Sequence, residues 1–173
     1  MMSAPLAAFL GDIARCLIGM LLLAAAAGKL RSYRAFRDNL SASFGVPAAG
    51  AALAAPALVA LEALLAAWLL AWGGPLPMLL SLLLLASLTI VLACRYFTQS
   101  VVRCSCFGEA QRPVSQHDLT RNGLVIAVNA LYFALPAMAA LPWQTSLLAA
   151  ALAAIACVAA IHFHDIATLA RAG

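Results

Sequence analysis

Apolar runs of about the length needed to cross a bilayer fill most of this chain. Hydrophobic residues make up 66% of the sequence and charged residues only 9%, and the mean hydropathy is +1.03. A soluble domain of this length needs more polar surface to cover its core, so the sequence predicts a chain surrounded by lipid. Because the backbone in lipid must satisfy its own hydrogen bonds, the Leu- and Ala-rich runs favour helices over strands.

The apolar runs predict about five transmembrane helices, at about 20 residues for each span. The run at residues 122–161 carries no charged residue or histidine and is too long for one helix. It is interrupted by Pro136, Pro142 and Trp143, so it is predicted to form the last two spans as a hairpin. The runs are residues 5–28, 49–72, 75–94 and 122–161. We therefore expect one all-α integral membrane domain over residues 1–173, with no second folded domain.

Basic residues lie in alternate loops of this layout, which predicts the orientation of the chain. They follow the first span, separate the third from the fourth and occur in the C-terminal tail: Lys29, Arg31, Arg34, Arg37, Arg95, Arg103, Arg112, Arg121 and Arg171. The positive-inside rule then predicts an N-terminus outside and a C-terminus in the cytoplasm. The expected location is the bacterial cytoplasmic membrane. Lipid headgroups, and not nucleic acid, are the expected counter-ions for the net charge of +4.

The loop after the first span has the pattern of a helix lying on the membrane surface. Arg31, Arg34 and Arg37 recur every third residue, while Leu30, Tyr33 and Leu40 fall on another face. A specific lipid contact and a plain topology determinant both explain this pattern.

The pair Cys104 and Cys106, separated by a single serine, is the strongest local signal. Side chains at this spacing diverge on a helix and on a strand, so they can form a disulfide only in a turn, where Gly108 supplies backbone freedom. A strained disulfide is more oxidising and exchanges readily. Arg103 favours the reactive thiolate, and Phe107 can seat the loop among lipid headgroups. The interpretation is thiol–disulfide oxidoreductase chemistry.

Two other interpretations of the cysteine pair remain open. Cys104 and Cys106 can bind a soft metal such as Cu(I) or Zn(II), with His117 or Cys94 as a further ligand. The pair can also be incidental. The other cysteines, Cys16 and Cys157, fall inside spans and are expected to be small buried hydrophobic groups.

Charged residues inside predicted spans form a second signal, because each is costly in lipid unless it is paired or hydrated. Arg15 and Glu62 each lie about ten residues, or about 15 Å, from the outer ends of antiparallel spans. This depth predicts that Arg15 pairs with Glu62, and Asp12 can join three residues from Arg15 on the same helix face. The group specifies packing or forms a polar pocket for a quinone headgroup or a proton.

Several polar residues have simpler predicted roles. Ser115 and Asp118 have the spacing of an N-terminal capping arrangement for the helix that leads into the fourth span. Asn129 and Thr89 are predicted to form hydrogen bonds between helices. The polar residues after the last span are expected to anchor it at the interface: His162, His164 and Asp165.

The order of these motifs resembles that of the MauE family, membrane accessory proteins of methylamine utilisation within a broader DoxX-like group. The resemblance covers most of the chain and rests on Gly28-Lys29-Leu30, Pro56 with Glu62, Cys104-Ser105-Cys106-Phe107-Gly108, and Arg121-Asn122. It implies a helper in maturing methylamine dehydrogenase, whose small subunit is rich in disulfides, beside a thioredoxin-like periplasmic partner. Soft-metal handling and non-catalytic assembly are the alternative functions.

One conflict stands between this function and the predicted orientation. Disulfide formation belongs outside the cell, whereas the charge rule places Cys104 and Cys106 at the cytoplasmic face. Either the protein passes thiol electrons across the membrane, or the loop folds into the bundle, or the redox assignment is wrong.

Overall fold

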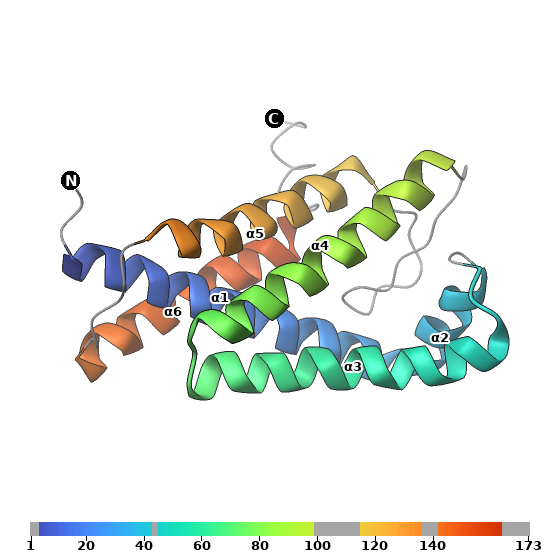
Figure 1. The fold of residues 1–173 in the computed structure, drawn as a ribbon, viewed down its shortest axis with the longest axis horizontal. Helices are drawn as coiled ribbons and strands as arrows, with labels where there is room; N and C mark the ends of the chain where they lie inside the picture. Colours follow the sequence, from blue (N-terminus) through green and yellow to red (C-terminus); the bar gives the residue numbers. More distant parts are fainter. Residues whose placement is uncertain (1–3, 43–44, 99–114, 136–141, 164–173) are drawn as a thin grey trace.

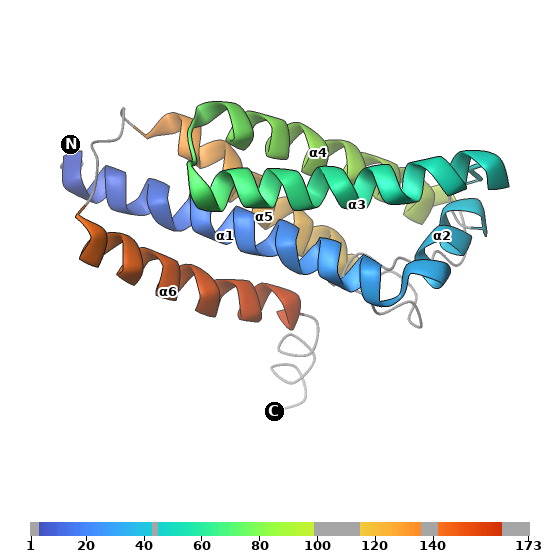
Figure 2. The same ribbon diagram turned by 90° about the horizontal axis from the view of Figure 1, so that it is seen from below.

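The computed structural model describes residues 4–42, 45–98, 115–135 and 142–163, and this part of the chain is helical throughout, without a strand. Five long helices run alternately in opposite directions, and one short helix follows the first (Figures 1 and 2). In chain order they are α1 (Ala4–Arg31), α2 (Tyr33–Ala42), α3 (Ala48–Ala71), α4 (Pro75–Thr98), α5 (Gln116–Ala134) and α6 (Trp143–Ile161).

Four of these helices are long and apolar enough to cross a membrane: α1, α3, α4 and α6. The predicted all-α membrane architecture is confirmed to this extent. α5 coincides with the predicted fourth span but is not among the four, since polar residues such as His117, Asp118 and Arg121 fill its first turns. The fifth span and the orientation of the termini stay predictions.

α1 is the central helix of the bundle, because it packs against α3, α5 and α6 (Figure 2). Its buried positions are largely small or aliphatic, among them Ala7, Ala14 and Ala26. Small residues allow helix backbones to approach closely where lipid offers no hydrophobic drive for association. At Gly19 a Cβ atom would lie 2.9 Å from the Leu70 side chain. This contact between α1 and α3 therefore requires a residue without a side chain or a shift of Leu70.

The reversal between α3 and α4 forms the tight turn that the sequence predicts. Gly73 and Gly74 have φ angles of +69° and +105°, which residues with a Cβ atom rarely adopt. The Gly73 N–H donates to Trp68 O at 3.0 Å and closes the last turn of α3. In Figure 1, α4 diverges from α3 with distance from this turn.

The described basic residues other than Arg15 lie toward one end of the bundle, opposite the N-terminus. α2 lies at this end (Figures 1 and 2). Its Phe36 is buried against Ala55 and Val59 of α3, while Arg34 and Arg37 are exposed. The predicted amphipathic segment is therefore a helix that packs through Phe36, with Tyr33 and Leu40 partly buried beside it, and turns its arginines outward.

Two smaller predictions are confirmed. The Ser115 N–H donates to Asp118 Oδ2 at 2.9 Å, so these residues form the predicted capping box of α5. Asn129 Nδ2 donates to Ser81 Oγ at 3.0 Å and links α5 to α4. His162 caps the end of α6, whereas His164 and Asp165 lie outside the described residues.

Candidate functional site

A buried ion pair joins α1 to α3 inside the bundle. Lys29 Nζ lies 2.8 Å from both carboxylate oxygens of Glu62, and the two residues are 3% and 2% exposed. Lys29 Nζ also lies 5.7 Å from the centroid of the Phe36 ring, at the distance of a cation–π contact. Glu62 therefore has the counter-charge that a carboxylate in lipid requires. That counter-charge is Lys29 and not Arg15. The predicted pairing of Arg15 with Glu62 is wrong.

Arg15 instead binds on its own helix and at the end of α3. It contacts Asp12 Oδ1 through Nε at 2.8 Å and Nη2 at 2.6 Å, as the spacing of three residues predicts. Its Nη1 donates to the carbonyl oxygens of Leu69 and Leu70. These carbonyls belong to the last turn of α3, where no later N–H of the helix can reach them. Arg15 therefore caps the C-terminus of α3.

The register of α1 against α3 explains the error. Arg15 lies level with Leu69 and Leu70, and Glu62 lies about two helical turns deeper along α3. Lys29 approaches from the other end of α1, and its long side chain reaches Glu62. The sequence carries a signal for the burial of Lys29, because Lys29 continues the helical spacing of Ile18, Leu22 and Ala25, which are all buried.

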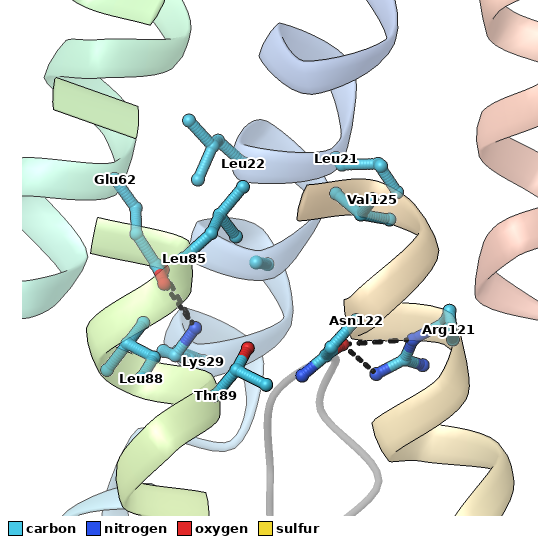
Figure 3. A pocket seen from close by; sticks show the side chains of 11 residues that line it. Leu21, Leu22, Lys29, Glu62, Leu85, Leu88, Thr89, Arg121, Asn122 and Val125 are labelled. Carbon is cyan, nitrogen blue, oxygen red and sulfur yellow. Dashed lines mark hydrogen bonds and ion pairs between the residues drawn. The ribbon is translucent and has the colours of Figure 1, made fainter. Parts of the chain in front are cut away.

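A pocket of about 60 Å³ lies beside this ion pair, between α1, α3, α4 and α5. Figure 3 shows Glu62 and Lys29 on one side of it, Arg121 and Asn122 on the other, and Thr89 between them. Apolar side chains complete the lining: Leu21, Leu22, Ala25, Leu85, Leu88 and Val125. The pocket therefore combines a polar end with an apolar wall.

The first turns of α5 supply the second polar group of the pocket. Arg121 is 7% exposed and donates from Nη2 and Nε to Asn122 Oδ1 at 3.2 and 3.4 Å. Its Nη1 lies 3.8 Å from Asp118 Oδ1, which belongs to the capping box. The start of α5 thus fixes Arg121 and, through it, the carboxamide of Asn122. Sequence reasoning assigned no pocket role to these residues or to Thr89, although Arg121-Asn122 stood among the motifs of the resemblance.

Thr89 differs from its prediction as an interhelical hydrogen-bonding group. In the described part of the chain its hydroxyl has no hydrogen-bond partner, and it faces the pocket. Asn122 Nδ2 likewise donates to no described group, because only the Oδ1 atom of this side chain is engaged. The arrangement offers two hydrogen-bond donors to a molecule in the pocket.

The predicted catalytic residues Cys104 and Cys106, with Arg103, Phe107 and Gly108, lie outside the described residues. The cysteines within the described ranges are free thiols: Cys16 and Cys157 are buried, and Cys94 is exposed on α4. Over those ranges, no three or more His, Cys, Asp or Glu residues come together as a metal site. The alternative ligand set of His117 with Cys104 and Cys106 stays untested, because it includes cysteines outside the described part.

The comparisons with known proteins identify a family. Residues 7–136 match the family described as Methylamine utilisation protein MauE. The searches among curated proteins and among solved structures find no match. The matched range extends from α1 through α5, so it contains the Lys29–Glu62 pair, the pocket and the cysteine pair. The chain therefore belongs to the MauE family and is a multi-pass membrane protein of methylamine utilisation.

Proposed function

We infer that this chain is a thiol–disulfide accessory protein in which Cys104 and Cys106 exchange disulfides with a thioredoxin-like partner. The observation that carries the proposal is the distribution of the other cysteines. Cys16 and Cys157 are buried in helix packing, and Cys94 stands on the exposed face of an apolar helix. Exchange with a water-soluble partner therefore depends on the Cys104–Cys106 pair.

The connectivity of the helices supports this assignment. α4 ends at Thr98 and α5 begins at Gln116, so the cysteine segment joins these two helices at the basic end of the bundle. Lys29, Thr89 and Arg121 of the polar pocket lie toward the same end of their helices. The two helix ends that flank the cysteine segment in the sequence thus lie toward the same end of the bundle as these polar residues.

The exchange balances without another reactant. A thiolate of the partner attacks one sulfur of the Cys104–Cys106 disulfide, and the other sulfur leaves as a thiolate. The second thiol of the partner then attacks the mixed disulfide. The partner becomes oxidised by two electrons and the Cys104–Cys106 pair becomes a dithiol, or the reverse. Arg103 beside Cys104 favours the thiolate, so Cys104 is the proposed lower-pKa thiol.

Single serine variants test the proposal. Replacing the resolving cysteine should trap the partner as a heavier band that disappears on reduction, so Cys104→Ser and Cys106→Ser are both made. Cys94→Ser is the matched control, because it removes an exposed thiol outside the pair. If neither single variant traps a partner and the double variant still supports maturation of the client, the redox function is excluded. Retention of Cu(I) or Zn(II) by the reduced pair would then favour metal handling.

The client in this proposal is the disulfide-rich small subunit of methylamine dehydrogenase, and the membrane is the bacterial cytoplasmic membrane. The side on which the cysteines act follows from the predicted orientation. A reporter fused after Gly173 should be active only in the cytoplasm, as the placement of the basic residues predicts. Activity of an alkaline phosphatase fused at the same position would reverse the orientation and move Cys104 and Cys106 to the periplasmic side.

A further inference from the structure

We propose that the pocket between α1, α3, α4 and α5 binds the uncharged carbonyl group of a largely apolar membrane molecule. The proposal concerns the described pocket and does not depend on the thiol chemistry proposed above. It rests on three properties of the pocket, which are the pairing of its charges, its two hydrogen-bond donors and its size.

The charges of the pocket favour an uncharged ligand group inside it. Glu62 is held by Lys29 through both carboxylate oxygens at 2.8 Å. Arg121 lies near Asp118 and donates to Asn122. Each charged side chain in the lining thus has a partner of opposite charge. An ionic ligand would have to disrupt these buried pairs, whereas an uncharged group can leave them intact.

The threonine at the pocket behaves unlike the other described threonines. Thr98, Thr120 and Thr145 each donate a hydrogen bond to a backbone carbonyl three or four residues earlier. This back-bonding is the usual way for a helical threonine to satisfy its hydroxyl. Thr89 makes no such bond within the described part of the chain and lines the pocket instead. Its hydroxyl is available as a donor.

Asn122 offers the second donor at the same end of the pocket. Arg121 fixes the carboxamide by donating to Oδ1, which leaves the Nδ2 group without an acceptor among the described residues. Two donors that line the same pocket (Figure 3) are suited to an acceptor with two lone pairs, such as a carbonyl oxygen. Fixing a donor before the ligand arrives reduces the ordering that binding requires.

The size and lining of the pocket define the rest of the ligand. About 60 Å³ accommodates the carbonyl end of a molecule and its nearest atoms. Leu85 and Leu88 of α4 and Val125 of α5 are only partly buried, so the apolar remainder can continue along them. Two membrane molecules carry this chemistry, which are a quinone with its ring carbonyl and a phospholipid with its acyl ester.

Binding to the purified full-length protein tests the site with both probes. Decylubiquinone is measured by equilibrium dialysis against delipidated protein in a non-ionic detergent, and phosphatidylethanolamine adducts are measured by native mass spectrometry. Thr89→Val and Asn122→Asp should each weaken binding of the true ligand about tenfold, the size expected for one lost hydrogen bond. Asn122→Asp keeps the oxygen that accepts from Arg121 and replaces the amide donor with a carboxylate oxygen, which also adds a negative charge beside Arg121.

Two further variants separate the site from general effects. Thr89→Ser restores the hydroxyl and should restore binding. Thr120→Val makes the same chemical change as Thr89→Val on an exposed residue of α5 and should leave binding unchanged. Saturable binding of one probe with this pattern identifies the source of the carbonyl. The proposal is overturned if neither probe binds, or if Thr89→Val and Asn122→Asp leave binding unchanged. The pocket would then be a water-filled space.

Discussion

Two charged pairs involve α1, and they differ in almost every physical respect. Asp12 and Arg15 are neighbours on one helix face, near the α3–α4 turn, with side chains 12% and 20% exposed. Lys29 and Glu62 come from different helices, and their side chains are 4% and 2% exposed. The first pair completes the end of a helix, and the second joins two helices inside the bundle.

The difference between the pairs shows how a membrane helix accommodates charge. Arg15 satisfies carbonyls that α3 leaves unpaired in any case, and its position near the end of α3 is partly open. Lys29 and Glu62 have no such access, so each depends on the other. The outer pair should therefore tolerate substitution better than the inner pair, and the predictions below test this ranking.

The largest expected effect is at Glu62. Glu62→Gln leaves the Lys29 ammonium buried without its counter-charge, and breaking one partner of a buried pair typically costs about 3–5 kcal/mol. The free energy of unfolding, measured by titration with SDS in mixed micelles, should fall by this amount. Lys29→Met in the same chain should recover part of the loss, because it removes the unmatched charge.

Arg15→Gln is the discriminating control for that experiment. It should not rescue Glu62→Gln, since Arg15 does not contact Glu62 and the two losses should add. Rescue by Arg15→Gln and not by Lys29→Met would contradict the register in which Arg15 lies level with Leu69 and Leu70.

A smaller loss is expected at the outer pair. Arg15→Met removes the hydrogen bonds to Asp12, Leu69 and Leu70 but keeps an apolar stem of similar length. Hydrogen bonds to charged groups contribute about 1.5–3 kcal/mol, so we expect a loss of about 2 kcal/mol in the same titration. A loss as large as that of Glu62→Gln would mean that the two pairs are energetically equivalent.

The turn beside Arg15 gives the third effect. Gly73→Ala places a side chain on a residue with φ of +69°, and its Cβ would lie 2.5 Å from Arg15 Cδ. The left-handed conformation alone costs about 1–2 kcal/mol. Gly74→Ala is the control for the contact, because its φ is also positive and a Cβ there meets nothing within 4 Å. In an Arg15→Ala background, Gly73→Ala should lose the part of its effect that comes from the contact.

The smallest effect is expected at the neutral polar contact between α4 and α5. Ser81→Ala removes the acceptor of the Asn129 hydrogen bond, and such bonds between membrane helices contribute about 0.6 kcal/mol on average. Ser87→Ala is the control, because Ser87 is exposed and, among the described residues, donates only to Leu84 O of its own helix. A loss at Ser81 comparable to that at Glu62 would remove the distinction between charged and neutral contacts.

Most of the helical architecture could be predicted from local patterns. The predicted starts at residues 5, 49 and 75 lie within one residue of the observed starts of α1, α3 and α4. Gly73 and Gly74 indicated the turn, and Ser115 with Asp118 indicated the start of α5. These features depend on residues close in the sequence, so a sequence can specify them without reference to distant contacts.

The pocket could not be predicted in the same way. Thr89 and Asn122 are both polar residues in long helices, and the sequence predicts an interhelical hydrogen bond for Thr89 as readily as for Asn129. Only the structure separates them, because Asn129 meets Ser81 whereas Thr89 faces an open space. Whether Thr89 finds a partner depends on the separation of α4 and α5 from α1 and α3 at the depth of Thr89. No local sequence pattern encodes this separation.

The sequence by itself determined that this chain is helical and suited to a membrane, that its basic residues gather at one end, and that Asp12 and Arg15 share a helix face. It also determined that Glu62 needs a cation, since an unpaired carboxylate in lipid is too costly to persist. Only the tertiary structure decided that the cation is Lys29. The choice depends on the register of α1 against α3, set by contacts such as Gly19 with Leu70. A shift of two turns along a helix moves a side chain by about 10 Å, which is enough to exchange one partner for another.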